Sequence, residues 1–339
     1  MLISPPFGGG RAPVLAKNTV ASSQPLATQA GIEALQNGGN AVDAALATAI
    51  TLTVVEPTMN GLGGDGFAIL WDGKQIHGLN ASGRAPAAWT PEYFDGKTAM
   101  DLIGWNTVTV PGMVSGWVEL SKKFGKLPFA QLFKRAIDYA ENGFPVSPVI
   151  ARQWREAIPI LKNQPGFAES FLIDGKAPQA GQIWRFPAQA KTLQEIAATQ
   201  GESFYTGALA QSMVDFAQSS GGCFTMRDFA DNKPDWVEPL AFDYGDYTLL
   251  EIPPNGSGIA AQMALGILQA ANVKQYPANS AQRIHLQIEA MRLAFADAYA
   301  YVSDSRSMSI PVTNLLNRDY LASRAALIDH HKAGSYSAG

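Results

Sequence analysis

The chain has 339 residues, which is enough to bury a large core and to divide into lobes. Its formal net charge is −4, only 16% of its residues are charged and no basic run occurs, so neither nucleic acid nor an anionic membrane is an expected partner. Cys223 is the only cysteine, which excludes an intrachain disulfide and favours a reducing compartment.

The beginning of the chain predicts a strand followed by two helices. Met1–Pro6 lacks the basic start and apolar run of a secretory signal, and no stretch reaches transmembrane length, so we expect a cytoplasmic protein. A strand is predicted at Val14–Ala21, and a helix is predicted to start at Pro25. Asn40 is expected to cap the next helix, Ala41–Val55, whose apolar residues lie nearly all round and predict burial on several sides.

The glycine-rich segment Gly61–Gly66 lies between this helix and a predicted hairpin. Phosphate-binding loops follow the order strand, loop, helix, so the opposite order here indicates a structural turn. The hairpin consists of strands at Phe67–Trp71 and Ile76–Leu79. The loop Asn80–Pro86 that follows the second strand is a usual position for binding residues.

Helices dominate the remainder of the chain. We predict a helical lobe at about residues 110–220, a hairpin at Leu240–Ile252 and a helix at Ile259–Ala270. A long amphipathic helix is predicted at Ala281–Val302, with an apolar stripe formed by Ile284, Ile288, Met291, Phe295 and Val302. The small, polar stretch His330–Gly339 is either a flexible tail or a processing site. Together these elements indicate a layered fold of mixed helices and strands.

Few residues form a recognisable catalytic group. The four histidines have no zinc-ligand spacing, so a zinc site is not expected. Cys223 has no base beside it and fits an apolar filler better than a nucleophile, and Ser115 does not match a serine-hydrolase elbow. Arg84, which lies between small residues on the loop after the hairpin, has two open interpretations. It could bind a carboxylate bidentately or pair with an internal acid for structural reasons.

Several separate segments resemble the γ-glutamyltranspeptidase family. The resemblance covers about residues 14 to 330, which is nearly the whole chain, and its spread over many motifs makes it specific. The segments include Gly38–Ala45, Val55–Phe67, Val110–Gly116, Phe124–Pro128, Ala140–Phe144, Phe204–Gly207, Pro253–Gly258 and Glu289–Asp297.

The resemblance implies an N-terminal-nucleophile hydrolase with a four-layer αββα sandwich. In this family one precursor cleaves itself into a large and a small subunit, and the new N-terminal threonine of the small subunit is the nucleophile, with its own amine as base. This chain, residues 1–339, would then be the large subunit, sharing one domain with the small subunit and holding no catalytic residue itself. Gly339 would precede the scissile bond. The resemblance further implies acyl transfer without metal or cofactor, in a heterodimer or a dimer of heterodimers.

One departure from the family pattern concerns the carboxylate ligand. Transpeptidases have an arginine three residues before the Ala-Pro pair that corresponds to Ala85-Pro86, and this arginine holds the glutamyl α-carboxylate. Ser82 stands at that position here, and the nearest arginine is Arg84. We therefore expect Arg84 to contact a carboxylate and Ser82 to line the pocket. A small carboxylate-bearing amide, as cleaved by oxamate amidohydrolases, fits this departure.

Other functions stay open at this stage. Within the family, the alternatives are a γ-glutamyl hydrolase or transpeptidase acting on glutathione-like substrates, and a glutaryl-type cephalosporin acylase. Outside it, the chain could be a non-catalytic scaffold on a degenerate copy of the fold, or a standalone enzyme that uses Cys223. The residue encoded after Gly339 discriminates the enzyme from the scaffold, because the enzyme needs a threonine there.

Overall fold

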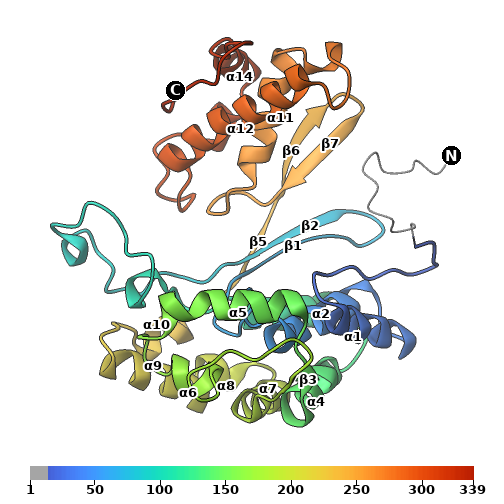
Figure 1. Ribbon diagram of the computed structural model, residues 1–339, viewed down its shortest axis with the longest axis vertical. Coiled ribbons are helices and arrows are strands. Elements are labelled where there is room, and N and C mark those ends of the chain that lie inside the picture. Colours follow the sequence, from blue (N-terminus) through green and yellow to red (C-terminus); the bar gives the residue numbers. More distant parts are fainter. Residues whose placement is uncertain (1–13) are drawn as a thin grey trace. The chain divides into compact units, whose positions relative to one another are not determined.

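Residues 14–339 are described by a computed structural model and fall into two compact units (Figure 1). The first unit comprises the chain up to Asp65 together with Ser82–Lys233, and the second comprises Gly66–Ala81 and Pro234–Gly339. The expectation about a signal at Met1–Pro6 concerns residues outside the described range. Helices and strands occur together, which confirms the mixed α/β class. The prediction of a single domain shared with a small subunit, with a helical lobe at about 110–220, concerns the complete enzyme and stays a prediction.

The first unit is mainly helical. Its core contains an aromatic cluster in which the Trp154 ring lies 6.0 Å from that of Phe186, nearly parallel to it, and 5.0 Å from that of Trp184. Large aromatic side chains bury much apolar area, so this cluster contributes strongly to the stability of the unit. The elements are α1 (Pro25–Gln36), α2 (Ala41–Val55), α3 (Met113–Phe124), α4 (Lys134–Asn142), β3 (Phe144–Pro145), α5 (Pro148–Leu161), α6 (Phe167–Phe171), β4 (Ile183–Trp184), α7 (Pro187–Thr199), α8 (Glu202–Tyr205), α9 (Ala208–Ser219) and α10 (Met226–Ala230), with 3₁₀ turns at Glu92–Phe94, Trp105–Thr107 and Phe129–Phe133.

The strand predicted at Val14–Ala21 is wrong. These residues have no regular secondary structure, and Val14 and Leu15 are each 79% exposed. A strand exists only through hydrogen bonds to a neighbouring strand, and in the described part of the chain no strand pairs with this segment. Sequence pattern alone reports a preference for extended backbone and cannot report the partner.

The start of α2 is fixed by a fully buried carboxylate. Asn40 caps the helix, as the sequence predicts, and it forms a capping box with Asp43, which accepts a hydrogen bond of 2.8 Å from the Asn40 amide. The same carboxylate also accepts from the backbone amides of Lys126 and Leu127, at 3.0 and 3.3 Å. Asp43 therefore joins the cap of α2 to the turn that follows α3, which gives its buried charge a structural role.

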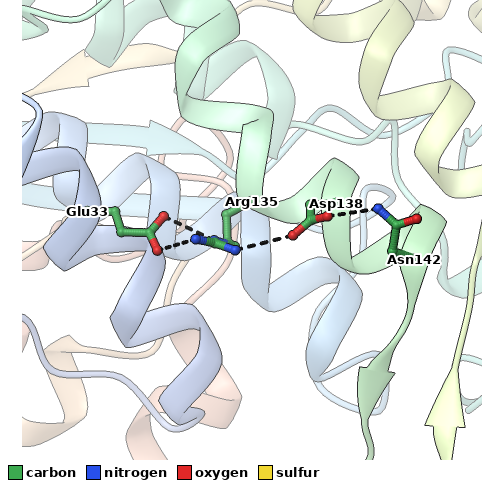
Figure 2. A network of polar contacts seen from close by, with 4 residues as sticks. All are labelled: Glu33, Arg135, Asp138 and Asn142. Atoms are coloured by element: carbon green, nitrogen blue, oxygen red, sulfur yellow. Dashed lines mark hydrogen bonds and ion pairs between the residues drawn. The ribbon is translucent and has the colours of Figure 1, made fainter.

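A second polar contact joins α1 and α4. Arg135 on α4 forms an ion pair with Glu33 on α1 and donates a hydrogen bond of 3.2 Å to Asp138 (Figure 2). Asn142 extends the network by donating to Asp138 at 2.9 Å. The Arg135 and Glu33 side chains are 36% and 39% exposed, so solvent screens the pair and its contribution is small.

The second unit combines strands with helices. Strand β1 (Gly66–Trp71) pairs with β2 (Ile76–Ala81), which pairs with β5 (Asp235–Val237), all antiparallel. Hydrogen bonds also join β6 (Leu240–Tyr244) to β7 (Tyr247–Glu251), so both predicted hairpins are confirmed. The helices are α11 (Ile259–Ala270), α12 (Ala281–Tyr301), α13 (Val312–Leu315) and α14 (Arg318–Ala325), with a 3₁₀ turn at Val273–Gln275 (Figure 1).

The buried face of α12 differs from the predicted stripe. Ile284, Ile288 and Met291 are 45%, 53% and 38% exposed, whereas Phe295 and Val302 are partly buried against the core. The core face instead carries small and aliphatic side chains together with two acids: Leu286, Glu289, Ala290, Leu293, Ala294, Asp297 and Ala298. The prediction favoured the larger apolar residues. Packing against α11 favours the smaller ones, because they allow close helix approach.

Candidate functional site

The loop that carries Ser82 and Arg84 is held rigidly within the first unit. The Arg84 carbonyl accepts a hydrogen bond of 2.9 Å from the Val110 amide, and the Thr109 hydroxyl lies 3.5 Å from the Ser82 carbonyl. Further along, the Ala87 amide donates to the Asp228 carboxylate at 2.8 Å. The backbone is thus fixed on both sides of the half-buried Arg84 side chain. Fixed backbone is a requirement for precise ligand positioning.

Gly83 explains how this loop approaches its neighbour so closely. Its φ of +82° lies in the left-handed region, and a Cβ at this position would lie 1.8 Å from the Val110 carbonyl oxygen. Only glycine satisfies both conditions. Ser82 and Arg84 are therefore separated by a residue that cannot carry a side chain.

Tyr205 supports the segment against which the Arg84 loop packs. Its hydroxyl donates to the Pro111 carbonyl at 2.7 Å and accepts from the Ser115 amide at 2.9 Å, which fixes the segment that holds the Arg84 loop. Burial raises the pKa of Tyr205 to about 12, so the hydroxyl keeps its proton at neutral pH. The Ser115 hydroxyl donates to the Gly112 carbonyl at 2.7 Å, in keeping with a structural role for this serine.

The remaining sequence candidates are not assembled into a site. His77 pairs with Asp72 at 2.8 Å within the β1–β2 hairpin, His285 bonds the Asp329 carbonyl at 2.7 Å, and His330 and His331 are exposed. Cys223 lies next to Tyr93, whose pKa is raised by burial and by this thiol. Among the described residues, no three His, Cys, Asp or Glu side chains are grouped to hold a metal ion. None of the helices in residues 14–339 is long and apolar enough to cross a bilayer.

The stretch His330–Gly339 is anchored at its far end, and not flexible there. Its anchor is a buried ion pair between Asp297 on α12 and Arg324 on α14, with the Arg324 Nε–Asp297 Oδ2 distance 3.1 Å. Arg324 also donates to the Ser337 carbonyl at 2.6 Å, and Asp297 accepts from the Gly339 amide at 3.0 Å. Tyr301 donates to the Gly339 carbonyl oxygen at 2.6 Å. Ser337–Gly339 is therefore held through its backbone.

A second buried acid holds the preceding residues. Glu289 on α12 accepts hydrogen bonds from the Gly334 amide at 2.7 Å and from the Tyr336 hydroxyl at 2.5 Å, and it pairs with Arg292 at 3.0 Å. Burial opposes ionisation of Glu289, but these hydrogen bonds outweigh it and lower its pKa. The alternative of a flexible tail is wrong, because Glu289 and Asp297 together fix Gly334–Gly339.

Sequence reasoning missed these anchors as functional residues. Glu289 and Asp297 are eight positions apart on α12, so they share a face, and both lie on the side that packs into the core. That signal was present in the sequence: two acids stand among small apolar residues at helical spacing. Charged residues are almost never fully buried unless they are paired, so their positions required partners from elsewhere in the chain.

Comparison with known proteins places these features in a family. The sequence model of gamma-glutamyltranspeptidase matches residues 27–338. A glutathione hydrolase-like proenzyme of Bacillus subtilis is 37% identical over 307 residues, covering 90% of this chain and 58% of the relative. An oxamate amidohydrolase proenzyme of Klebsiella pneumoniae is 35% identical over 322 residues, covering 93% and 60%. The chain thus spans about 60% of the length of the curated relatives that it matches.

Solved structures agree with this result. A chain of the gamma-glutamyltranspeptidase from Pseudomonas nitroreducens, complexed with L-DON, superposes with a TM-score of 0.87 at 32% identity, covering 95% of this chain and 97% of the other. The cephalosporin acylase from Bacillus halodurans superposes with a TM-score of 0.85 at 42% identity, covering 95% and 63%.

Proposed function

The chain belongs to the gamma-glutamyltranspeptidase family, and we propose that it is the large-subunit portion of a self-cleaving amide hydrolase that acts on a small, carboxylate-bearing amide. Curated relatives are named as proenzymes and extend well beyond the matched region, which supports a second portion of the same precursor. In contrast, one chain of the Pseudomonas nitroreducens structure is matched over 97% of its length, which supports a separate polypeptide of this size.

The proposed reaction is acyl transfer to an N-terminal nucleophile of the small subunit. The nucleophile's hydroxyl attacks the substrate amide carbon, the amine leaves with a proton, and water then hydrolyses the ester. No residue of this chain reacts covalently. Together the two subunits would complete the four-layer αββα sandwich, and the exposed apolar residues Ile284, Ile288 and Met291 of α12 support a covering partner. A cytoplasmic location stays part of this proposal.

The observation that carries the substrate proposal is the preorganised loop around Arg84. Its backbone is fixed by Val110 on one side and Asp228 on the other, so the loop would not have to reorder its backbone when the guanidinium meets a carboxylate. Arginine suits this role because its planar fork binds both carboxylate oxygens. Ser82, two residues earlier, would line the same pocket. The oxamate amidohydrolase among the relatives favours a small substrate, and the acylase and glutathione hydrolase names keep glutaryl and γ-glutamyl amides as alternatives.

The test uses the complete precursor and three substrate classes: oxamate, glutaryl amides and γ-glutamyl amides. Arg84→Ala should raise KM for the preferred acidic substrate by about 10- to 100-fold, the range of a lost charge-assisted hydrogen bond, and Arg84→Lys should restore only part of it. Arg227→Ala is the matched control, because the Arg227 side chain is 88% exposed and pairs only locally with Asp231. An unchanged KM in Arg84→Ala would remove this residue from the site.

The competing scaffold hypothesis has its own test. A precursor that separates into two polypeptides, the second of which begins with threonine, supports the enzyme. A precursor that stays in one piece, together with no turnover of any of the three substrate classes, would support a non-catalytic protein instead. The Cys223 enzyme is tested separately by thiol alkylation, and full activity after complete blocking ends that hypothesis.

A further inference from the structure

We propose that a cavity in the helical part of the first unit binds a small apolar or aromatic carboxylate, and that Arg185 binds the carboxylate group. The cavity has a volume of about 720 Å³, which lies within the usual range of sites for small molecules. It is lined by the end of α6, by β4 and by the start of α7, and all of its lining residues lie between positions 169 and 189. The proposed amide hydrolysis makes no use of this cavity.

Apolar and aromatic side chains form most of the walls. Ile173 and Ile183 line the cavity and are 51% and 56% exposed. Exposed apolar side chains that gather around one cavity, and are not scattered singly, indicate a ligand-binding site. A ligand with an apolar or aromatic body would remove this surface from water. The apolar walls consist of Phe171, Leu172, Ile173, Ile183, Trp184 and Phe186.

The aromatic part of the walls is preorganised by the core of the unit. Trp184 and Phe186 are only 5% and 7% exposed, and their rings lie 5.0 and 6.0 Å from that of Trp154. The Trp154 indole also donates a hydrogen bond of 2.9 Å to the Phe171 carbonyl, which fixes the end of α6. A ligand therefore meets walls that are already formed and does not have to order them, which favours affinity.

Arg185 also lines the cavity, and it is held at two points. Its Nε atom donates a hydrogen bond of 3.2 Å to the Asn142 carbonyl. Its side-chain stem lies against Gly143, whose φ is +96°, and a Cβ there would lie 3.1 Å from the Arg185 Cγ atom and 2.5 Å from the Ile183 Cγ2 atom. Glycine therefore permits this close approach. The Asn142 side chain in turn bonds to Asp138, within the network of Figure 2.

The charge of Arg185 indicates an anionic ligand. Within residues 14–339 no carboxylate forms an ion pair with this guanidinium, and its Nη1 and Nη2 atoms donate to no other residue. These two nitrogens can meet both oxygens of a carboxylate, a geometry that arginine matches. Glu169, the acid in the lining, is exposed, so solvent screens its repulsion of an anion. Apolar walls beside a cation without an acid partner are what a small apolar carboxylate requires.

The test uses the full-length protein and three probes in isothermal titration calorimetry. Naphthoate carries both features of the expected ligand, naphthamide has the same rings without the charge, and acetate has the charge without the rings. We expect naphthoate to bind with a Kd below about 1 mM, and naphthamide to bind about tenfold more weakly or worse, because it cannot form the charge-assisted pair. Acetate should give no measurable binding in the same range, because it buries almost no apolar surface.

Three variants locate the binding. Arg185→Gln should weaken naphthoate binding by about tenfold or more and leave naphthamide binding unchanged, with the melting temperature of the wild type, because the side chain is exposed. Glu169→Gln is the matched control: it removes an exposed charge of opposite sign from the same lining, so naphthoate should bind at least as tightly as in the wild type. Ile183→Asp, which places a negative charge on the apolar wall, should abolish naphthoate binding.

Any one of three results would overturn the proposal. Equal binding of naphthoate and naphthamide would show that no carboxylate is recognised. Naphthoate binding that persists in Arg185→Gln would place the probe elsewhere in the protein. No binding of naphthoate at concentrations of several millimolar would show that the cavity takes no ligand of this class.

Discussion

Each unit buries an aspartate completely, and the two carboxylates are stabilised by different partners. Asp43 in the first unit is surrounded by backbone amides of the fold, including those of Lys126 and Leu127. Asp297 in the second unit is paired with Arg324 and accepts from the Gly339 amide of the tail. The comparison teaches that burial of an acid does not reveal its role. The partner does. Amides inside the folded unit indicate that the acid supports the architecture, whereas an amide of the tail indicates that the acid holds that segment in place.

The largest expected effect comes from removing the architectural carboxylate. Asp43→Ala removes a fully buried carboxylate and leaves the amides of Asn40, Lys126 and Leu127 without their acceptor, so the free energy of unfolding should fall by about 3 kcal/mol or more. Urea unfolding followed by tryptophan fluorescence measures it, because most tryptophans belong to the first unit, namely Trp89, Trp105, Trp117, Trp154 and Trp184.

The control for this change is an exposed acid in a similar helical position. Asp319 lies in the first turn of α14 and is exposed, so Asp319→Ala should cost less than about 1 kcal/mol. Asp43→Asn, which keeps one acceptor oxygen, should fall between the two. If Asp43→Ala lost no more stability than Asp319→Ala, the architectural role assigned to the buried carboxylate would be wrong.

Lowering the pH is expected to have an intermediate effect, which is a loss of protection in the tail, Gly334–Gly339. The hydrogen bonds to Glu289 lower its pKa below the ordinary 4.5, so the ionised acid stabilises the docked tail. This stabilisation is complete at pH values above 4.5 and is lost as the pH falls through the lowered value. Hydrogen exchange of Gly334–Gly339, corrected for intrinsic rates, should therefore be constant at neutral pH and accelerate in acid.

Glu289→Gln provides the comparison for the acid effect. The amide cannot ionise, so the exchange of the tail should lose its dependence on pH in the acid range, from a less protected starting point. Equal protection of the wild-type tail at neutral pH and well below pH 4.5 would contradict the anchoring role of the Glu289 carboxylate.

The smallest effect is expected at the exposed network between α1 and α4. Arg135→Gln removes the ion pair with Glu33, but both side chains are more than a third exposed, so the loss should stay below about 1 kcal/mol. Added salt should reduce it further. The same urea assay at low and high salt measures the change, and a loss as large as that of Asp43→Ala would show that exposure is a poor guide to these contacts.

Local signals in the sequence predicted much of the fold. The local patterns were sufficient for elements that depend on neighbouring residues: the Asn40 cap, the helix Ala41–Val55 and the hairpin Phe67–Leu79. The strand at Val14–Ala21 and the buried face of α12 depend on what packs against them, and both predictions failed. Tertiary contacts override local preference in such places.

The candidate sites follow the same division. Arg84 and Ser82 were found because the loop composition and the family resemblance marked them, and their roles stay predictions. The docking of Ser337–Gly339 was not foreseen, because it requires Asp297 and Arg324 to meet from separate helices. The sequence analysis assigned a different face of α12 to the core, so only the three-dimensional structure shows that Asp297 is buried and that the tail is its partner.

The glycine at position 83 has a consequence for how new substrate preferences could arise. With no room for a side chain beside the Val110 carbonyl oxygen, the middle of this loop cannot be varied without displacing the backbone. Diversification, whether natural or in a laboratory library, is therefore confined to the flanking positions, Ser82 and Arg84. A two-position library would sample most of the chemistry that this loop can offer while leaving its scaffold intact.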